Sequence, residues 1–268
     1  MTEITSPGSS KLYYETYNLD NKSADVSPIL FLNGMTQTTM SWKTLARRLR
    51  DTYPVITYDA QGQGQSIPAK DASFELAMHA DDLSALLDEL DVERVHLVGF
   101  SHGSRVALAM ANHHPQRVDH LVLCSATATP TALQRTIIRG WREILRHGGL
   151  EAMSWAALPT ILGNAYLEQH EHLIKGIISA STSRNQPEGV ASLLDAMMHY
   201  PDLSELATQV QSPTLVISGE EDLLVTRTGA EKLAELCGGT HHEVAQVAHT
   251  VPIENPGEFQ KLLLDFLP

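Results

Sequence analysis

Short apolar runs alternate with stretches of helical periodicity through the first half of the chain. Strands are predicted where the runs are short and rich in β-branched and aliphatic residues, at Ile29–Leu32, Val55–Tyr58, Val95–Phe100 and Leu121–Cys124. Helices are predicted between them, at Trp42–Leu49, about Ser73–Leu90 and Ser101 to about His114. Strands alternating with helices in this way predict an α/β fold, in which helices cover both faces of a mostly parallel sheet.

The strand pattern stops after Ala128 and returns only at Thr214. Between about Pro130 and Thr208 only helices are predicted, at Leu133–Arg146, Leu150–Leu158, Ala165–Ser179 and Val190–Tyr200. The last part returns to the earlier pattern, with a strand at Thr214–Ser218, a helix at Arg227–Leu236, a strand near His242–Val247 and a helix at Pro256–Phe266. Residues 1–129 and 209–268 are therefore expected to form the core, and residues 130–208 a helical cap that shapes a site.

Composition narrows the class of protein. The chain is 43% hydrophobic and 19% charged, as is typical of a soluble globular protein. Its 32 acidic and 19 basic residues give a formal charge of −13. An acidic surface repels phosphate backbones and anionic lipid headgroups, so neither nucleic acid nor a membrane surface is expected as a partner. The sequence favours no particular oligomeric state.

The cysteines, the N-terminal residues and the lengths of the apolar runs predict a cytoplasmic protein without a cofactor. The two cysteines suggest neither a disulfide framework nor a metal cluster, and Cys124 lies in an apolar run as a small buried hydrophobe would. The first ten residues lack the basic and apolar regions of a signal peptide. No apolar run approaches the roughly 20 residues that span a bilayer.

A candidate nucleophile lies in the sequence Gly-Phe-Ser-His-Gly at 99–103. This G-x-S-x-G pattern follows a predicted buried strand and precedes a predicted helix, which is the setting of a nucleophile elbow. The sharp turn exposes the hydroxyl of Ser101, and the small residues Gly99 and Gly103 let the strand and helix approach each other. The helix N-terminus also favours negative charge that develops beside Ser101.

With these residues the chain resembles the α/β-hydrolase superfamily over essentially its whole length. The resemblance implies an eight-stranded, mostly parallel sheet and a catalytic triad in the chain order nucleophile, acid, histidine. Serine at the elbow argues against the dehalogenase and epoxide-hydrolase branches, in which this residue is an aspartate.

The acid implied by the resemblance is Asp222. It closes a Gly-Glu-Glu-Asp sequence after the strand beginning at Thr214, where the superfamily has G-x-x-D. Glu220 and Glu221 are the alternatives. In some members the acid follows the preceding strand, but residues 125–129 of this chain contain no carboxylate.

The base implied by the resemblance is His249, because it follows the last predicted strand, downstream of Ser101 and Asp222. It would accept the proton of Ser101 and return it to the leaving group, while Asp222 holds its tautomer and stabilises its cation. His241 and His242 are expected on the surface of the last strand.

Two backbone N–H groups should bind the developing oxyanion. One belongs to His102, whose side chain is not expected to be catalytic. The second belongs to Met35 by position, in an Asn33–Gly34–Met35 loop where the superfamily commonly has His-Gly-x. Asn33 and Gly34 are therefore expected beside the substrate, and the asparagine side chain cannot titrate.

Two further patterns were weighed as binding motifs. The turn at 59–66 resembles the superfamily's D-x-x-G-x-G-x-S turn and is expected to be structural, since it lacks G-x-G-x-x-G leading into a helix. His170, Glu171 and His172 suggest a metal, but residues at i and i+2 do not share a helical face, so a solvated surface is favoured. No metal ligand set and no cofactor are predicted.

The predicted cap supplies apolar side chains that either line an acyl pocket or pack the cap. They are Trp141, Trp155, Leu158, Ile161, Leu162, Ile177, Ile178, Met197 and Met198. Of these, Trp141 and Trp155 are our candidates for substrate contact. This apolar content favours a small apolar acyl substrate over a strongly ionic one.

Three functions fit the sequence. The first is a serine esterase or thioesterase, which cleaves an apolar carboxylic ester, thioester or lactone through an acyl-serine intermediate. The second is an acyltransferase, because residues 33–42 look similar to the asparagine–glycine loop of bacterial 3-hydroxyacyl transferases of the rhamnolipid-precursor synthase type. The third is a non-catalytic ligand-binding protein on the same fold.

Overall fold

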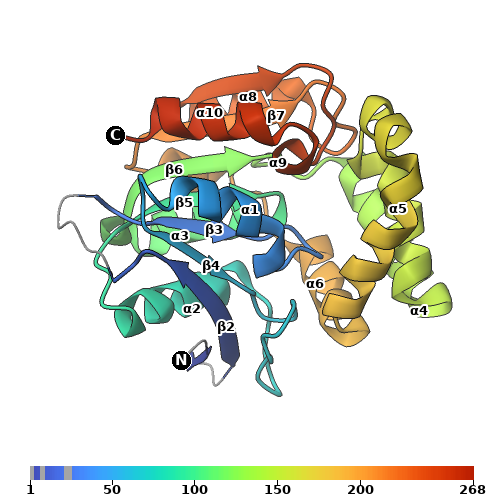
Figure 1. Ribbon diagram of the computed structural model, residues 1–268, viewed down its shortest axis with the longest axis horizontal. Helices are drawn as coiled ribbons and strands as arrows, with labels where there is room; N and C mark the ends of the chain where they lie inside the picture. Colours follow the sequence, from blue (N-terminus) through green and yellow to red (C-terminus); the bar gives the residue numbers. More distant parts are fainter. Residues whose placement is uncertain (1–2, 7–9, 21–25) are drawn as a thin grey trace.

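The strands of this protein form one central sheet in the computed structural model, which describes residues 3–6, 10–20 and 26–268 (Figure 1). The sheet has eight strands, in the order β1-β2-β4-β3-β5-β6-β7-β8. Their bounds are β1 (Glu3–Thr5), β2 (Lys11–Tyr17), β3 (Ile29–Leu32), β4 (Val55–Tyr58), β5 (Val95–Phe100), β6 (Val118–Cys124), β7 (Thr214–Gly219) and β8 (Thr240–Val244).

All strand pairs from β4 to β8 are parallel, whereas β1–β2 and β2–β4 are antiparallel. The predicted fold class, a mostly parallel eight-stranded sheet with flanking helices, is confirmed. Hydrophobic pattern alone did not locate β1 and β2. β1 is an edge strand and β2 lies next to it. In β2 only Leu12 and Tyr14 are buried, so its apolar signal is weaker than that of a central strand.

Helices connect the strands and extend into the predicted cap. Their bounds are α1 (Thr39–Leu49), α2 (Leu76–Glu89), α3 (His102–His113), α4 (Ala132–Ile161), α5 (Asn164–Arg184), α6 (Pro187–His199), α7 (Ser204–Thr208), α8 (Arg227–Leu236), α9 (Val251–Glu254) and α10 (Pro256–Phe266), with a 3₁₀ turn at Pro115–Arg117. The short helices α7 and α9 were not predicted. Within the described part of the chain, no helix combines the length and apolar character needed to cross a bilayer.

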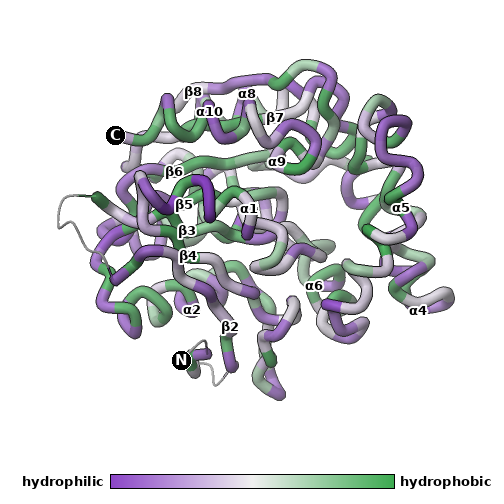
Figure 2. Tube along the Cα trace, viewed as in Figure 1, coloured by the Kyte–Doolittle hydropathy of each residue, from purple (hydrophilic) through white to green (hydrophobic). Residues whose placement is uncertain are grey.

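Alternation along the strands divides the buried side chains between the two faces of the sheet. In β3, Ile29 and Phe31 join the cluster that holds α1 and α10, where Trp42 stacks on Phe31 with ring centroids 4.6 Å apart. Leu30 and Leu32 point to the other face and join α2, α3 and α8. The central strands are accordingly among the most hydrophobic segments of the chain (Figure 2).

Helices α4, α5 and α6 lie together at one side of the sheet (Figure 1). Helix α4 is interrupted at Gly149, whose φ of 78° and ψ of 178° are not helical, so the two helices predicted here meet at a break. Leu158, Leu162, Ile174 and Ile178 form a small separate cluster between α4 and α5. Helix α7, in contrast, packs against α3 and α8 of the core.

Candidate active site

Ser101 occupies a strained turn between β5 and α3. Its φ of 53° and ψ of −112° lie outside the regions that residues with a side chain normally adopt. Such strain, worth about 1–3 kcal/mol, persists only where the surroundings fix the backbone. Here the N–H of Ser101 donates to the carbonyl of Cys124 at 2.8 Å, which ties the turn to the neighbouring strand.

The two glycines of the elbow are required by backbone approach on each side of Ser101. A Cβ on Gly99 would lie 2.6 Å from both the Gly103 carbonyl oxygen and the Cα of Ser104. A Cβ on Gly103 would lie 2.8 Å from the Asn33 carbonyl oxygen and would collide with the backbone at the end of β3. Helix α3 therefore reaches its position against β3 and β5 only with glycine at both places.

A chain of hydrogen bonds joins the three side chains singled out in the sequence. The Oγ of Ser101 lies 2.9 Å from Nε2 of His249, and Nδ1 of His249 lies 2.8 Å from Oδ2 of Asp222. A carboxylate only accepts, so Nδ1 carries the proton and Nε2 is free to accept from the serine hydroxyl. The side chain of Asp222 is 0% exposed and that of His249 is 6% exposed, which keeps water from these bonds.

Asp222 is held by the backbone that follows it. Its Oδ1 accepts from the N–H groups of Leu224 at 2.7 Å and Val225 at 2.9 Å, which leaves Oδ2 for the histidine. Of the two alternatives, Glu220 accepts from the N–H of Gln246, and Glu221 is exposed and has no contact with His249. The geometry therefore favours Asp222 as the acid.

The loop after β3 carries the predicted oxyanion donors and is fixed by two glutamine side chains. Nε2 of Gln63 donates to the carbonyls of Gly34 at 2.7 Å and Met35 at 3.0 Å, while Oε1 of Gln37 accepts from the N–H of Gly34. Within the described chain the N–H of Met35 has no acceptor. His102 is the first residue of α3, whose leading N–H groups have no partner inside the helix.

Asn33 does not line the cavity, which corrects the expectation that it lies beside the substrate. Its side chain is buried, its Nδ2 donates to the carbonyl of Tyr58, and its Oδ1 accepts from the indole N–H of Trp42, both at 2.7 Å. These bonds use the amide to join the loop to β4 and α1. Gly34, in contrast, does line the cavity beside Ser101.

The turn at 59–66 supports this loop, as its structural interpretation anticipated. Asp59 accepts from the N–H groups of Thr39 at 2.7 Å and Gln65 at 2.9 Å. Burial raises the pKa of the Asp59 carboxyl to about 6. The role of Gln63 in holding the oxyanion loop was missed, because its partners lie 28 and 29 residues away and leave no local signal.

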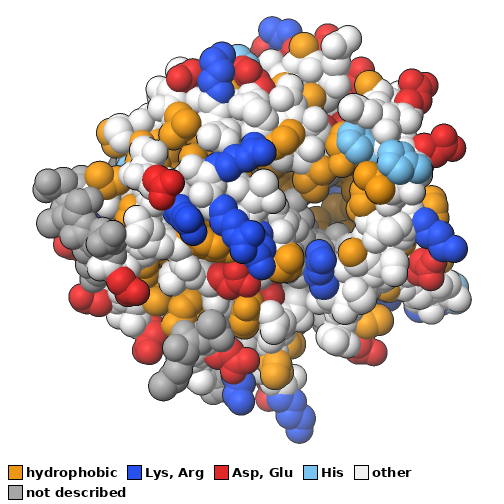
Figure 3. Space-filling view, viewed as in Figure 1, with side chains coloured by type: hydrophobic (Ala, Val, Ile, Leu, Met, Phe, Trp, Pro, Cys, Tyr) orange, Lys and Arg blue, Asp and Glu red, His pale blue; other side chains and the backbone are white. Residues whose placement is uncertain are grey.

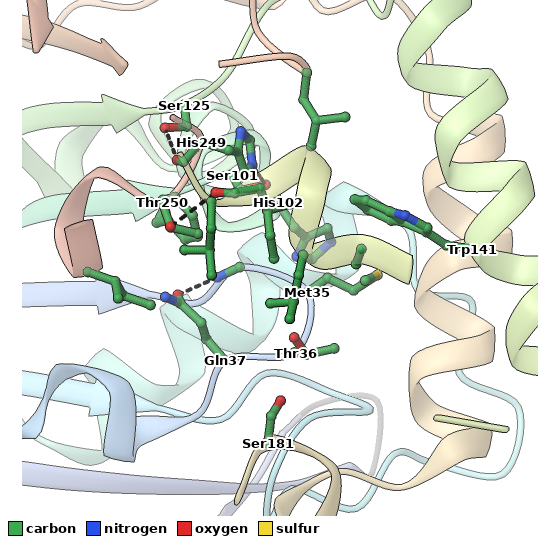
Figure 4. A pocket seen from close by; sticks show the side chains of 18 of the residues that line it. Met35, Thr36, Gln37, Ser101, His102, Ser125, Trp141, Ser181, His249 and Thr250 are labelled. Carbon is green, nitrogen blue, oxygen red and sulfur yellow. Dashed lines mark hydrogen bonds between the residues drawn. The ribbon is translucent and has the colours of Figure 1, made fainter. Parts of the chain in front are cut away.

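A cavity of about 420 Å³ opens beside Ser101 and reaches to the cap helices. In Figure 3 the surface is hollowed next to these helices and hydrophobic side chains rim the opening. Figure 4 shows Ser101, His249 and Met35 on one side and Trp141 across from them. The polar and apolar lining from the cap includes Gln134, Trp141, Met153, Leu158, Ile161, Leu162, Ile177, Ile178, Ser181 and Met197.

Trp155 is not part of this lining, which corrects the second tryptophan prediction. Its side chain is 45% exposed on the outer side of α4, whereas Trp141 is 7% exposed and lines the cavity. The break at Gly149 lies between the two tryptophans and resets the helical phase, so periodicity does not place both on one face. Met198 also lies outside the lining.

The side chain of His102 is a buried, neutral part of the cavity floor. Its Nε2 lies 3.0 Å from the hydroxyl of Tyr200, and that hydroxyl donates its own proton to the carbonyl of Phe74. His102 must therefore donate through Nε2. Burial holds the pKa of His102 well below its usual range, which fits a packing role for the side chain.

The candidate metal motif is a helix surface. His170 stacks on Tyr166, and its Nδ1 lies 2.9 Å from the carbonyl of that residue, while Glu171 and His172 are exposed on α5. Among the residues that the structure describes, no three His, Cys, Asp or Glu side chains are grouped as metal ligands would be.

Comparison with known families agrees with this architecture. Residues 27–143 match the family described as "alpha/beta hydrolase fold", and residues 90–258 match the family described as "Serine hydrolase (FSH1)". The two matches overlap across the elbow at Ser101 and together cover strands β3 to β8, the cap helices and the histidine loop.

Individual relatives share the whole length of the chain. It is 28% identical over 254 residues to pyrrolizixenacetamide deacetylase of Xenorhabdus hominickii, with 94% of each protein covered. Among solved structures, it is similar to an enol-lactonase from Burkholderia xenovorans at 25% identity and a TM-score of 0.87, with 98% of each chain covered. It is also similar to Est816, an N-acyl homoserine lactone degrading enzyme, at 27% identity and a TM-score of 0.82, with 99% and 100% covered.

Proposed function

The chain belongs to the α/β-hydrolase superfamily, and from this premise we propose that it is a serine hydrolase that cleaves an apolar carboxylic ester, thioester or lactone through an acyl-Ser101 intermediate. The observation that carries the proposal is the hydrogen-bonded chain from Ser101 through His249 to Asp222 beside a cavity. The relatives named as a deacetylase, an enol-lactonase and an N-acyl homoserine lactone degrading enzyme support acyl chemistry.

In the first step Ser101 attacks the substrate carbonyl while its proton passes to Nε2 of His249. The imidazolium that forms is stabilised by the buried carboxylate of Asp222, whose second oxygen is held by two backbone N–H groups. The proton then moves to the leaving alcohol or thiol, and the carbonyl re-forms as the acyl-serine.

The tetrahedral oxyanion is proposed to sit between the N–H groups of Met35 and His102. Both come from segments that the fold fixes before the substrate arrives, the loop braced by Gln63 and the first turn of α3. Preorganised donors of this kind stabilise charge without reorganising, and removing one typically lowers the rate about 10²–10³-fold. In the second step His249 activates water, which releases the acid.

The position of Asn33 weakens the acyltransferase alternative. The asparagine–glycine loop was its main support, and the Asn33 amide is bonded to Tyr58 and Trp42 on the side away from the cavity. It is therefore not placed to orient a hydroxyl acceptor. Hydrolysis is favoured, and the partner in the second step is water.

The test uses 4-nitrophenyl esters and acyl thioesters of graded length, with the products identified by mass. We expect free acid as the main product, labelling of Ser101 by a serine-directed phosphonate, and a loss of about 10⁶-fold in kcat for Ser101→Ala. Ser181→Ala is a matched control, because this serine also lines the cavity but makes no contact with His249. Transfer of the acyl group intact to an added thiol or hydroxy acid, or binding without turnover, would contradict the proposal.

A further inference from the structure

Arg105 lies on the same helix as the nucleophile, one turn beyond it, and lines the cavity. The side chain is mostly buried, its Nη1 is fully enclosed without a hydrogen-bond partner, and burial lowers the pKa of the guanidinium. No carboxylate of the described chain lies within ion-pair distance of it. A buried cation without a partner is costly, so it is normally retained where a ligand supplies the opposite charge.

The polar groups nearest to Arg105 are already engaged elsewhere. The hydroxyl of Tyr200 donates to Phe74 and accepts from His102. The carboxylate of Asp202 is exposed and accepts from the N–H of Ser204 at 2.7 Å and the hydroxyl of Thr129 at 2.8 Å. Asp202 influences Arg105 only through its charge, and no described side chain forms an ion pair or hydrogen bond with the guanidinium.

All the charged residues that line the cavity are positively charged. Its described charged residues are Arg105, Arg135 and Arg184, without a single aspartate or glutamate, in a chain with 32 acidic and 19 basic residues. Arg135 donates to the carbonyl of Pro130 at its own helix start, and Arg184 is exposed at the end of α5. Arg105 is therefore the buried cation of a positively charged cavity in an otherwise acidic protein.

We propose that the natural substrate carries a carboxylate and that Arg105 binds it while Ser101 attacks the acyl carbon. This rests on the proposed function and names its substrate class, a monoester or lactone of a short dicarboxylic acid. Arg105 follows Ser101 by four residues in the first turn of α3, and both line the same cavity, so a short carbon chain is proposed to join the carboxylate to the acyl carbon. Apolar groups such as Trp141 and Leu158 then face the rest of the molecule.

This class refines the expectation that the substrate is apolar. The cavity combines an apolar body with one fixed cation, and this suits an amphiphile with an anionic end rather than a fully apolar ester. A guanidinium matches a carboxylate with two parallel hydrogen bonds, so it also orients the acyl carbon toward Ser101. Arg105 acts in this proposal as a substrate-binding residue.

The test compares two esters that differ only at the far end, mono(4-nitrophenyl) glutarate and 4-nitrophenyl pentanoate, after subtraction of the spontaneous reaction. We expect the intact enzyme to prefer the glutarate ester in kcat/KM by at least about tenfold. Arg105→Met should lower the ratio of the two values by about 10- to 100-fold, as expected when a hydrogen bond to a charged group is lost. Arg105→Lys should give an intermediate ratio, because it retains the charge without the fork.

Arg139→Met is the matched control, since this exposed arginine on α4 does not line the cavity. It should leave the ratio unchanged. Equal use of the two esters by the intact enzyme, or a preference that survives Arg105→Met, would overturn the inference while leaving the hydrolase proposal intact.

A binding measurement separates this inference from the proposed function. In Ser101→Ala, calorimetry with monomethyl glutarate and methyl pentanoate should show tighter binding of the acid, and adding Arg105→Met should remove the difference. This holds even if no ester is turned over, a result that would contradict the hydrolase proposal alone. If Arg105→Met and Asp202→Asn instead lower the unfolding temperature alike without changing carboxylate binding, Arg105 is structural and the inference is wrong.

Discussion

The cavity has two walls that are built differently. On the sheet side, the side chains at the strand ends are fixed by hydrogen bonds: His249 joins Ser101 to Asp222, and Gln63 braces the loop of Met35. On the cap side, α4, α5 and α6 present mainly apolar side chains, and the separate cluster inside the cap contains only four buried residues.

This difference assigns the chemical step to the sheet side and the choice of substrate to the cap side. The chemical step requires atoms within hydrogen-bond reach and correctly oriented, so the polar groups are placed on the most rigid part of the fold. Substrate choice requires only shape and charge, which side chains on the cap helices can supply. Substitutions on the sheet side should therefore affect rate and folding, whereas those in the cap should change preference.

After the loss of the nucleophile itself, the largest effect is expected at the acid. Asp222→Asn should lower kcat about 10⁴-fold, since an amide at this place favours the wrong tautomer of His249. Steady-state kinetics with a 4-nitrophenyl ester measure the loss. Glu220→Gln and Glu221→Gln are the controls and should stay within a few-fold of the unmodified enzyme. A severe loss in Glu221→Gln would mean that the acid has been misplaced.

The next effect concerns the elbow glycine. Gly103→Ala would place a methyl group 2.6 Å from the carbonyl carbon of Leu32 and 2.8 Å from the Asn33 carbonyl oxygen. Because these are backbone atoms, α3 must move away from β3, with a loss of about 3 kcal/mol in unfolding free energy. Urea unfolding followed by circular dichroism measures this, and an unchanged midpoint would show that the helix adjusts freely.

These two sites were predictable from the sequence because their determinants are local. The glycine pattern around Ser101 spans five residues, although the requirement for Gly103 comes from the backbone at the end of β3. Asp222 follows a strand whose apolar pattern is plain. His249 follows β8, in which only Val244 is buried, so its place in the chain order identified it. The central sheet was predictable for the same reason, with β3, β4 and β5 at their predicted bounds.

The roles of Asn33 and Arg105 could not be predicted, because contacts with distant parts of the chain determine them. The bonds of Asn33 go to Trp42 and Tyr58, nine and 25 residues away, and nothing in the loop itself indicates that they consume its amide. Arg105 follows Ser101 by one helical turn, which places it near the nucleophile. That its charge lacks a partner depends, however, on how α3 packs against the segment around Tyr200.

Acid should weaken the sheet side first, because neutral histidines are buried there. Burial lowers the pKa of His79 to about 4, and its Nε2 has no partner. The unfolded chain takes up this proton near pH 6.5 and the folded protein only near pH 4, so stability falls as the pH drops through this range. His79→Leu should remove this contribution, worth about 3 kcal/mol at pH 4.

The measurement for His79 is urea unfolding of both proteins at pH 7 and at pH 4.5. The difference between them isolates this histidine from Asp59, whose raised pKa acts in the opposite direction. His199→Leu in the cap is the control, since this histidine is exposed and should not change the slope. Parallel pH profiles for the unmodified protein and His79→Leu would show that His79 is already protonated in the folded state.

A smaller effect, on preference, is expected in the cap. Trp141→Phe enlarges the cavity opposite Ser101 and should shift the relative kcat/KM of C2 to C8 4-nitrophenyl esters toward longer chains by about tenfold. Trp155→Phe makes the same chemical change on the outer side of the cap, and there we expect no shift. Equal shifts in both variants would mean that the cap acts through its stability and not through the shape of the cavity.

The smallest expected effect is a gain in unfolding free energy from a glycine substitution in the cap, opposite in sign to the loss expected for Gly103→Ala. Gly176 lies exposed in α5, and a Cβ added there would meet nothing within 4 Å. Because alanine restricts the unfolded chain and favours a helix, Gly176→Ala should raise the unfolding free energy by about 0.5–1 kcal/mol, while Gly103→Ala lowers it. Urea unfolding in parallel with Gly103→Ala measures both.

If the cap unfolds before the sheet, the gain from Gly176→Ala should appear only in the early transition and leave kcat unchanged. A gain in one shared transition would instead show that the two walls unfold together, and a loss would mean that α5 depends on glycine at this position.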